Sequence, residues 1–244
     1  VNFFANKGGK MRKLASKLKE EIEDLEENKV DVRREDKTIR EFNIPSQGIV
    51  GNVVTIKSIK IIKNHEPVEK DVDILLRQRD RLLISGPNGV GKSTLLRSLV
   101  SGTNEGAIIL KDTRVGYYSQ DFATLNYDQT VFDSLADALA LGQGTDIQEM
   151  RSVAAGFLLT GEMMGLKISH LSEGQKGLLS FARLVLMKPG LLVLDEPTNH
   201  INFRHIPIIA EAINNYQGAI ILISHMPEFV KKIEFGNKLD LGTY

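Results

Sequence analysis

The stretch Gly86-Pro-Asn-Gly-Val-Gly-Lys-Ser-Thr94 follows an apolar run at residues 82–84 and leads into a second apolar pattern that starts at Leu95. A strand, a glycine-rich loop and a helix in this order have the spacing of a phosphate-binding loop. Glycines allow backbone N–H groups to turn toward an anion, and the positive end of the following helix adds to the attraction. The residues that we expect to bind nucleotide phosphates are Gly86, Asn88, Gly89, Gly91, Lys92, Ser93 and Thr94.

Two side chains of this loop carry specific chemistry. The Lys92 ammonium can reach the β- and γ-phosphates, and the Ser93 hydroxyl can ligate Mg²⁺. The alternative is a glycine turn that arose by chance, but the strand and helix patterns on either side argue against it. The loop therefore predicts an α/β nucleotide-binding domain.

Composition narrows the class of protein. The chain has 244 residues, 31 basic and 31 acidic, and no cysteine. This excludes a disulfide scaffold and fits a reducing, cytoplasmic location. No apolar run approaches the roughly 18 residues that span a bilayer, and no signal peptide is present, so we expect no direct membrane insertion. Because the sequence begins at Val1, within a basic helical pattern, we expect it to be part of a longer protein.

The first 27 residues separate their charges. Residues 1–19 hold bases and no acid, and residues 20–27 hold acids and no base. Within the same stretch, apolar residues recur every three or four positions. This spacing predicts a long helix over about residues 10–28. The basic half suits a phosphate backbone or an acidic protein, and a solvated coiled-coil arm explains it equally well. The candidate RNA contacts are Lys7, Lys10, Arg12, Lys13 and Lys17.

The remaining patterns suggest how the chain is organised. Residues 1–52 are expected to be the linker helix and a connector, and residues 53–244 the compact domain. Residues 53–62 suggest a pair of strands, and alternation at residues 72–76 another, which together predict an antiparallel β subdomain. A helical lobe is expected at about residues 121–185, inserted into a core sheet. Two wholly apolar runs, residues 191–194 and 220–223, predict buried strands.

Polar residues follow several of these predicted strands. Asp195, at the end of one strand, can hold Mg²⁺ through water, and Glu196 can polarise a water aimed at the γ-phosphate. His225 could sense the γ-phosphate or be an ordinary structural histidine. Gln120 offers a neutral ligand for Mg²⁺ or the attacking water, or is a plain polar residue at a strand end. Ser172 suits a helix N-cap, and either caps a helix or opens a second phosphate-binding helix end.

Taken in order, these motifs resemble an ATP-binding-cassette (ABC) ATPase. Gly86–Thr94, Gln120, Leu171–Gln175, Leu194–Thr198 and His225 look like its Walker A, Q-loop, signature, Walker B and switch-histidine motifs. The resemblance implies a P-loop NTPase cassette that uses ATP and Mg²⁺. It assigns catalysis to Lys92, Glu196 and His225, and metal binding to Ser93, Gln120 and Asp195. In such cassettes two domains stack head to tail, so that Leu171, Ser172, Gly174 and Gln175 would serve a nucleotide on a partner cassette, and one cassette alone would hydrolyse ATP weakly.

Within this superfamily the chain resembles the ABC-F branch. The evidence is Asp195-Glu-Pro-Thr-Asn-His200, Phe157-Leu-Leu-Thr-Gly161 and a segment from Phe3 to Leu25 that is similar to the end of an inter-cassette linker. The resemblance implies a C-terminal cassette, paired with an upstream cassette or with a second copy, that acts on the ribosome in translation. The alternatives are the energy-coupling subunit of a membrane transporter and a non-hydrolysing, ATP-dependent interaction module.

Three positions depart from the family pattern. The inter-cassette loop reads His200-Ile-Asn202 where an aspartate usually closes the motif, so signalling between two sites is in doubt. No Phe, Tyr or Trp lies between Phe42 and Tyr117, which leaves base stacking to His65 or to no residue. Glu173 stands where glycine is common. We still expect hydrolysis, and the sequence leaves open whether the role is translation regulation, antibiotic protection or ribosome assembly.

Overall fold

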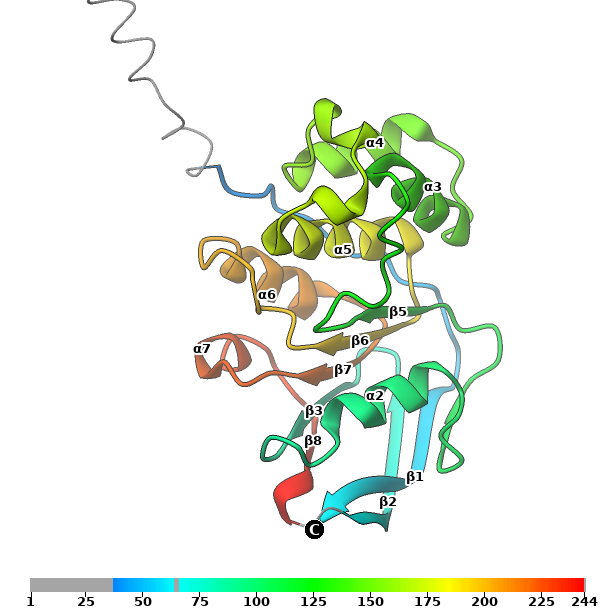
Figure 1. Cartoon of the computed structure of the whole chain (residues 1–244). Helices are drawn as coiled ribbons and strands as arrows, with labels where there is room; N and C mark the ends of the chain where they lie inside the picture. The colour runs from blue at the N-terminus through cyan, green and yellow to red at the C-terminus, as the bar shows by residue number, and fades with distance from the viewer. Residues whose placement is uncertain (1–36, 64–65, 244) are drawn as a thin grey trace, which may run out of the picture. The chain divides into compact units, whose positions relative to one another are not determined.

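The computed structural model describes residues 37–63 and 66–243 (Figure 1). Contacts divide the chain into residues 1–38 and residues 39–244, and the fold below is that of the second unit. The expected helix over residues 10–28 and the five candidate RNA contacts lie outside the described residues, as does His65.

A five-stranded parallel sheet forms the centre of this unit. Its strands are β3 (Arg81–Ser85), β5 (Val115–Tyr118), β6 (Leu191–Asp195), β7 (Ala219–Ile223) and β8 (Asn237–Asp240), in the order β5-β6-β7-β3-β8. Every residue of β6 and β7 is buried, as expected for apolar strands covered on both faces. The edge strand β8 was not expected from the sequence, because its four residues are mostly polar and Leu239 alone among them is buried.

The antiparallel β subdomain is confirmed, but its first strands differ from expectation. It contains β1 (Asn52–Lys63), β2 (Glu66–Arg77) and β4 (Ala107–Ile109), in the order β2-β1-β4. The prediction of a strand pair within residues 53–62 is wrong, since this stretch is one strand. A register irregularity between Ile56 and Ser58 shifts the alternation of buried residues, which made one strand resemble two.

The helices cover the two faces of the parallel sheet (Figure 1). Helix α2 (Lys92–Val100) follows β3, and the inserted lobe holds α3 (Val131–Leu141), α4 (Ile147–Gly156) and α5 (Glu173–Met187), with short 3₁₀ turns at Gly161–Gly165 and Ile168–His170. Side chains of Thr130, Asp146 and Ser172 cap the three lobe helices, as their residue types favour. The chain continues through α6 (Ile206–Asn215), α7 (Pro227–Val230) and a 3₁₀ turn at Leu241–Thr243.

The parallel sheet separates two hydrophobic clusters. Leu192, Leu194 and Leu222 face the cluster built with α3, α5 and α6, whereas Val193 and Ile221 face the cluster built with α2 and β1. The alternation follows from the two-residue period of a strand. Both faces are therefore closed, and the ends of the strands are left for binding.

The connector before β1 packs on this unit although it has no regular structure. Ile39 and Ile44 are buried, and the rings of Phe42 and Phe157 lie 4.7 Å apart, edge to face. The Gln47 N–H donates to the carbonyl of Pro189 at 3.0 Å. Residue 53, where the sequence placed the start of the domain, lies beside the first residue of regular structure, and the compact unit takes in residues 39–51 as well.

Candidate functional site

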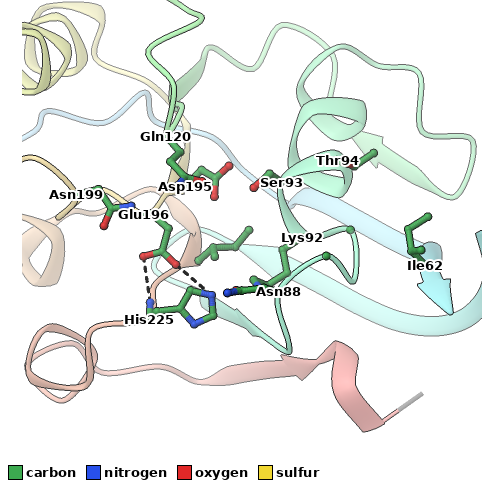
Figure 2. A pocket seen from close by; sticks show the side chains of 13 residues that line it. Ile62, Asn88, Lys92, Ser93, Thr94, Gln120, Asp195, Glu196, Asn199 and His225 are labelled. Carbon is green, nitrogen blue, oxygen red and sulfur yellow. Dashed lines mark hydrogen bonds and ion pairs between the residues drawn. The ribbon is translucent and has the colours of Figure 1, made fainter. Parts of the chain in front are cut away.

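A cleft of about 640 Å³ lies at the carboxyl ends of the central strands (Figure 2). Parallel strands bring their carboxyl ends to one edge of a sheet, which is where open α/β sheets bind ligands. The loop after β3 and the ends of β6 and β7 supply most of the lining, and β1 and the end of β5 supply the rest. The lining residues are Ile62, Asn88, Gly89, Gly91, Lys92, Ser93, Thr94, Gln120, Asp195, Glu196, Asn199, Ile223 and His225.

The glycines of the loop are required by its backbone. Gly86 has a φ of 138° and Gly91 a φ of 103°, a region that other residues rarely adopt. A Cβ atom on Gly86 would also lie 3.2 Å from the backbone nitrogen of Gly242. The Lys92 ammonium donates to the carbonyls of Gly86 and Pro87 at 2.8 and 2.9 Å, which holds it over the loop where a phosphate would lie. This arrangement is that of an anion-binding cradle at a helix N-terminus.

Asp195, at the end of β6, is the strongest indication of a cation in the cleft. Its side chain is buried, and neither carboxylate oxygen has a hydrogen-bond partner among the described residues. Burial raises the pKa of Asp195, and the neighbouring Ser93 hydroxyl offsets part of this rise. Gln120 and Ser93 line the same cleft as Asp195 (Figure 2). Buried oxygens without partners and neighbouring oxygen donors fit Mg²⁺, which prefers such ligands.

Glu196 and His225 face each other across the ends of β6 and β7. Glu196 takes a left-handed φ of 50°, and its N–H donates to the carbonyl of Ile223 at 2.9 Å. One carboxylate oxygen accepts the backbone N–H of His225 at 3.1 Å, and the other lies 3.5 Å from His225 Nε2. The Glu196 side chain is 8% exposed, whereas that of His225 is 53% exposed. A buried carboxylate therefore sits beside an imidazole that remains open to the cleft.

The predicted signature residues lie away from this cleft. None of Leu171, Ser172, Gly174 and Gln175 is among its lining residues. Ser172 and Gln175 instead form a reciprocal capping box, in which the Ser172 N–H donates to Gln175 Oε1 at 2.8 Å and the Gln175 N–H donates to Ser172 Oγ at 3.3 Å. The structure thus brings the Walker A, Q-loop, Walker B and switch-histidine residues together, and leaves the signature outside the group.

The loop after β6 lies against the signature helix. A Cβ atom on Gly174 would lie 3.1 Å from the carbonyl of His200, which itself has a φ of 62°. Asn202 Oδ1 accepts the N–H of Arg204 at 3.0 Å, so the amide serves the local turn. The inter-cassette loop and the signature therefore share one region of the surface.

Sequence reasoning missed three lining residues, Ile62, Asn199 and Ile223, the last of which was expected only as the end of a buried strand. Asn199 lies three residues beyond Glu196 and donates its N–H to the Glu196 carbonyl at 3.0 Å, a turn that the motif itself could have suggested. Ile62 had no sequence signal, because its place in the cleft depends on pairing between its N–H and the Val90 carbonyl at 3.0 Å. The described lining residues include no Phe, Tyr or Trp that could stack on a base. In the part of the chain that is described, no helix is long and apolar enough to cross a membrane.

Comparison with known proteins finds relatives that are described as ATP-binding or ABC proteins. A family model described as ABC transporter matches residues 69–199. The chain is 33% identical over 186 residues to the probable ATP-binding protein YbiT of Escherichia coli O157:H7, covering 75% of this chain and 35% of that protein. It is 32% identical over 226 residues to ABC transporter F family member 5 of Arabidopsis thaliana, covering 90% of this chain and 32% of that protein. The chain thus spans about a third of the length of these relatives.

Solved structures share the fold. An ATP-binding subunit of an ABC transporter superposes with a TM-score of 0.63 at 21% identity, covering 78% of this chain and 87% of that one. A dimeric, post-hydrolysis state of the cassette MJ0796 bound to ADP and phosphate gives a TM-score of 0.58 at 20% identity, covering 78% and 95%. The predicted cassette fold, with its antiparallel subdomain and inserted helical lobe, is confirmed.

Proposed function

The chain belongs to the ABC transporter family, with relatives in its F branch, and on that premise we propose that it is an ATP-hydrolysing cassette that works by closing on a second cassette. The observation that carries the proposal is the convergence of Lys92, Asp195, Glu196 and His225 in one cleft at the ends of β3, β6 and β7. Phosphoryl transfer to water depends mainly on positioning and charge stabilisation, and these four residues are of the types that supply both.

Each of these residues has a role that its surroundings support. Lys92, held above the glycine loop, binds the β- and γ-phosphates of ATP. Glu196 orients and polarises the attacking water, and its hydrogen bond from the His225 backbone fixes the carboxylate. The His225 side chain is 53% exposed, so a ring N–H can donate to the γ-phosphate. Ser93, Gln120 and Asp195 would hold Mg²⁺, which when bound neutralises charge on the phosphates.

The second cassette is proposed from the position of the signature. The capped start of α5 presents Ser172 and Gly174 outside the cleft of their own chain, so they are placed to bind a phosphate carried by another domain. A partner's signature would complete the cleft described above in the same way. Such a cassette hydrolyses ATP slowly by itself. The partner is either an upstream cassette of a longer chain or a second copy of this one.

We further propose that closure controls binding to the ribosome in the cytoplasm. Support comes from the F-branch relatives and from six bases without an acid in residues 1–19. A basic segment of this kind binds phosphate backbones through charge, and such binding weakens as salt rises. Pelleting with ribosomes should therefore increase with ATP in a Glu196→Gln variant and fall when Lys7, Lys10 and Arg12 are changed together to Glu. Equal pelleting of the Glu196→Gln variant with and without ATP would refute the proposed role on the ribosome.

The hydrolytic role is tested by phosphate release. Glu196→Gln keeps the shape of the carboxylate but not its charge, so ATP binding should persist while phosphate release falls by about 100-fold or more. Glu211→Gln, on the exposed face of α6, is the matched control and should behave as the wild type. Phosphate release by Glu196→Gln at the wild-type rate would refute the assignment.

A further inference from the structure

Helix α5 begins with a charge cluster that the proposed chemistry does not use. The Lys176 ammonium lies 2.8 Å from Glu173 Oε1, and the Lys176 side chain is 9% exposed. The same ammonium stands 4.9 Å from the centre of the Tyr127 ring. Lysine is rarely buried to this extent unless it is paired, and a cation over an aromatic ring is attracted by the face of that ring. The Lys176 ammonium therefore contacts both the Glu173 carboxylate of the signature and the ring of Tyr127.

Glu173 is the residue that this lysine constrains. It lies between Ser172 and Gly174, so its carboxylate is part of the surface expected to meet a partner's phosphate. Its side chain is 52% exposed. A carboxylate in the first turn suits the helix dipole, but it repels a second anion brought to the same turn. An unpaired Glu173 would therefore oppose the binding that the signature is proposed to perform.

We propose that Lys176 is a positioning residue that holds and neutralises the Glu173 carboxylate, so that the signature can accept the γ-phosphate of ATP bound to a second cassette. The inference rests on the proposed function of the signature. The Tyr127 ring and the low exposure of Lys176 hold the ammonium beside the Glu173 carboxylate. The arrangement allows an acid at position 173 without loss of anion binding.

The test measures ATP-driven association of the full 244-residue chain in a Glu196→Gln background. Lys176→Met keeps the apolar stem but removes the charge, and should weaken association by about five- to tenfold. Lys176→Arg should associate as the background does. The double change Glu173→Gln with Lys176→Met should restore association to within about twofold, because no carboxylate is left to neutralise. Lys188→Met, in the partly exposed pair with Glu149 just beyond the other end of α5, is the control and should have no effect.

Ionic strength gives a second reading of the same variants. The defect of Lys176→Met should shrink between roughly 0.1 M and 1 M NaCl, where the Debye length falls from about 10 Å to 3 Å. Binding of ATP to the isolated chain should be equal in all variants, since α5 lies outside its own cleft.

Two results would overturn the proposal. One is normal association of Lys176→Met, and the other is a double variant as weak as Lys176→Met, which would show a structural rather than an electrostatic role. If the Glu196→Gln protein with an unchanged signature does not associate in ATP at any concentration, pairing between two copies of this chain is refuted, and this inference for that pair with it.

Discussion

Replacing Asp195 by Asn should make the nucleotide-free protein more stable while it weakens the stabilisation by MgATP. Asp195 is 1% exposed, and neither of its carboxylate oxygens has a hydrogen-bond partner among the described residues. Burial raises the pKa of this acid, so the folded protein binds its proton more tightly than the unfolded chain does. Stability therefore falls as pH rises from the unfolded value of about 3.9 through the raised folded value, and the loss is complete above the folded value.

The size of the effect follows from the unpaired oxygens. Leaving a buried polar group without a partner costs about 1–3 kcal/mol, and more when the group is charged. Asparagine keeps the polar shape but loses the charge, so we expect a gain of about 1 kcal/mol at neutral pH. For a domain of this size that gain corresponds to a rise in Tm of roughly 2–4 °C.

Thermal unfolding in EDTA without nucleotide measures this gain. Asp128→Asn is the control, because its carboxylate is 93% exposed and its pair with Lys167 contributes little. Added MgATP should raise the Tm of the wild type, by mass action on the folded state, more than that of Asp195→Asn. The advantage of the variant should vanish below about pH 4, where the carboxyl is protonated in both states. An Asp195→Asn protein no more stable than the wild type in EDTA at neutral pH would refute the reasoning.

Three further changes test separate parts of the structure. Ile62→Tyr should give the cleft an aromatic face worth about 0.5–1.5 kcal/mol and lower the Kd for ATP, leaving the Kd for inorganic tripolyphosphate unchanged; an unaltered Kd for ATP would contradict this placement. Burial lowers the pKa of His205, so the free energy of unfolding should fall as pH drops below about 6.5. His205→Asn should reduce this dependence on pH, measured by urea unfolding. The same dependence on pH in the variant and the wild type would contradict this role of His205. Gly142→Ala would place Cβ 2.0 Å from the carbonyl oxygen of Leu186 and should lower the free energy of unfolding by about 2–4 kcal/mol. Gly161→Ala is the control, because nothing lies within 4 Å of its Cβ, and it should leave stability nearly unchanged. Similar losses of stability in both variants would show that the contact is not the cause.

The sequence predicted the parts of the fold that local pattern determines. The spacing of glycines beside apolar runs predicts strand β3, the glycine loop and α2. The apolar runs at residues 191–194 and 220–223 predict the buried strands β6 and β7. Helix α5 was predictable from Ser172, because its cap residues lie within three positions of each other. These signals act over a few residues and need no knowledge of tertiary contacts.

The features that were missed depend on partners far along the chain. Strand β8 is polar and exists through pairing with β3, and the unbroken β1 depends on the register with β2. The side chain of Gln47 accepts the N–H of Arg114 at 2.8 Å, a contact across 67 residues that fixes the connector on the domain. The cleft shows the same limit. Asp195 and Glu196 were predictable from their strand end, whereas Ile62 enters through a distant hydrogen bond with Val90.

The central claim is that each cleft is half of a site, completed by the signature of another cassette. Lys92→Ala disables the cleft and Ser172→Ala the signature, so each variant alone should release phosphate at background rate. In an equal mixture, a mixed pair has one intact cleft facing one intact signature, and random pairing should restore about a quarter of the wild-type rate. A mixture that stays at background, with wild-type chain active in the same assay, would contradict the account.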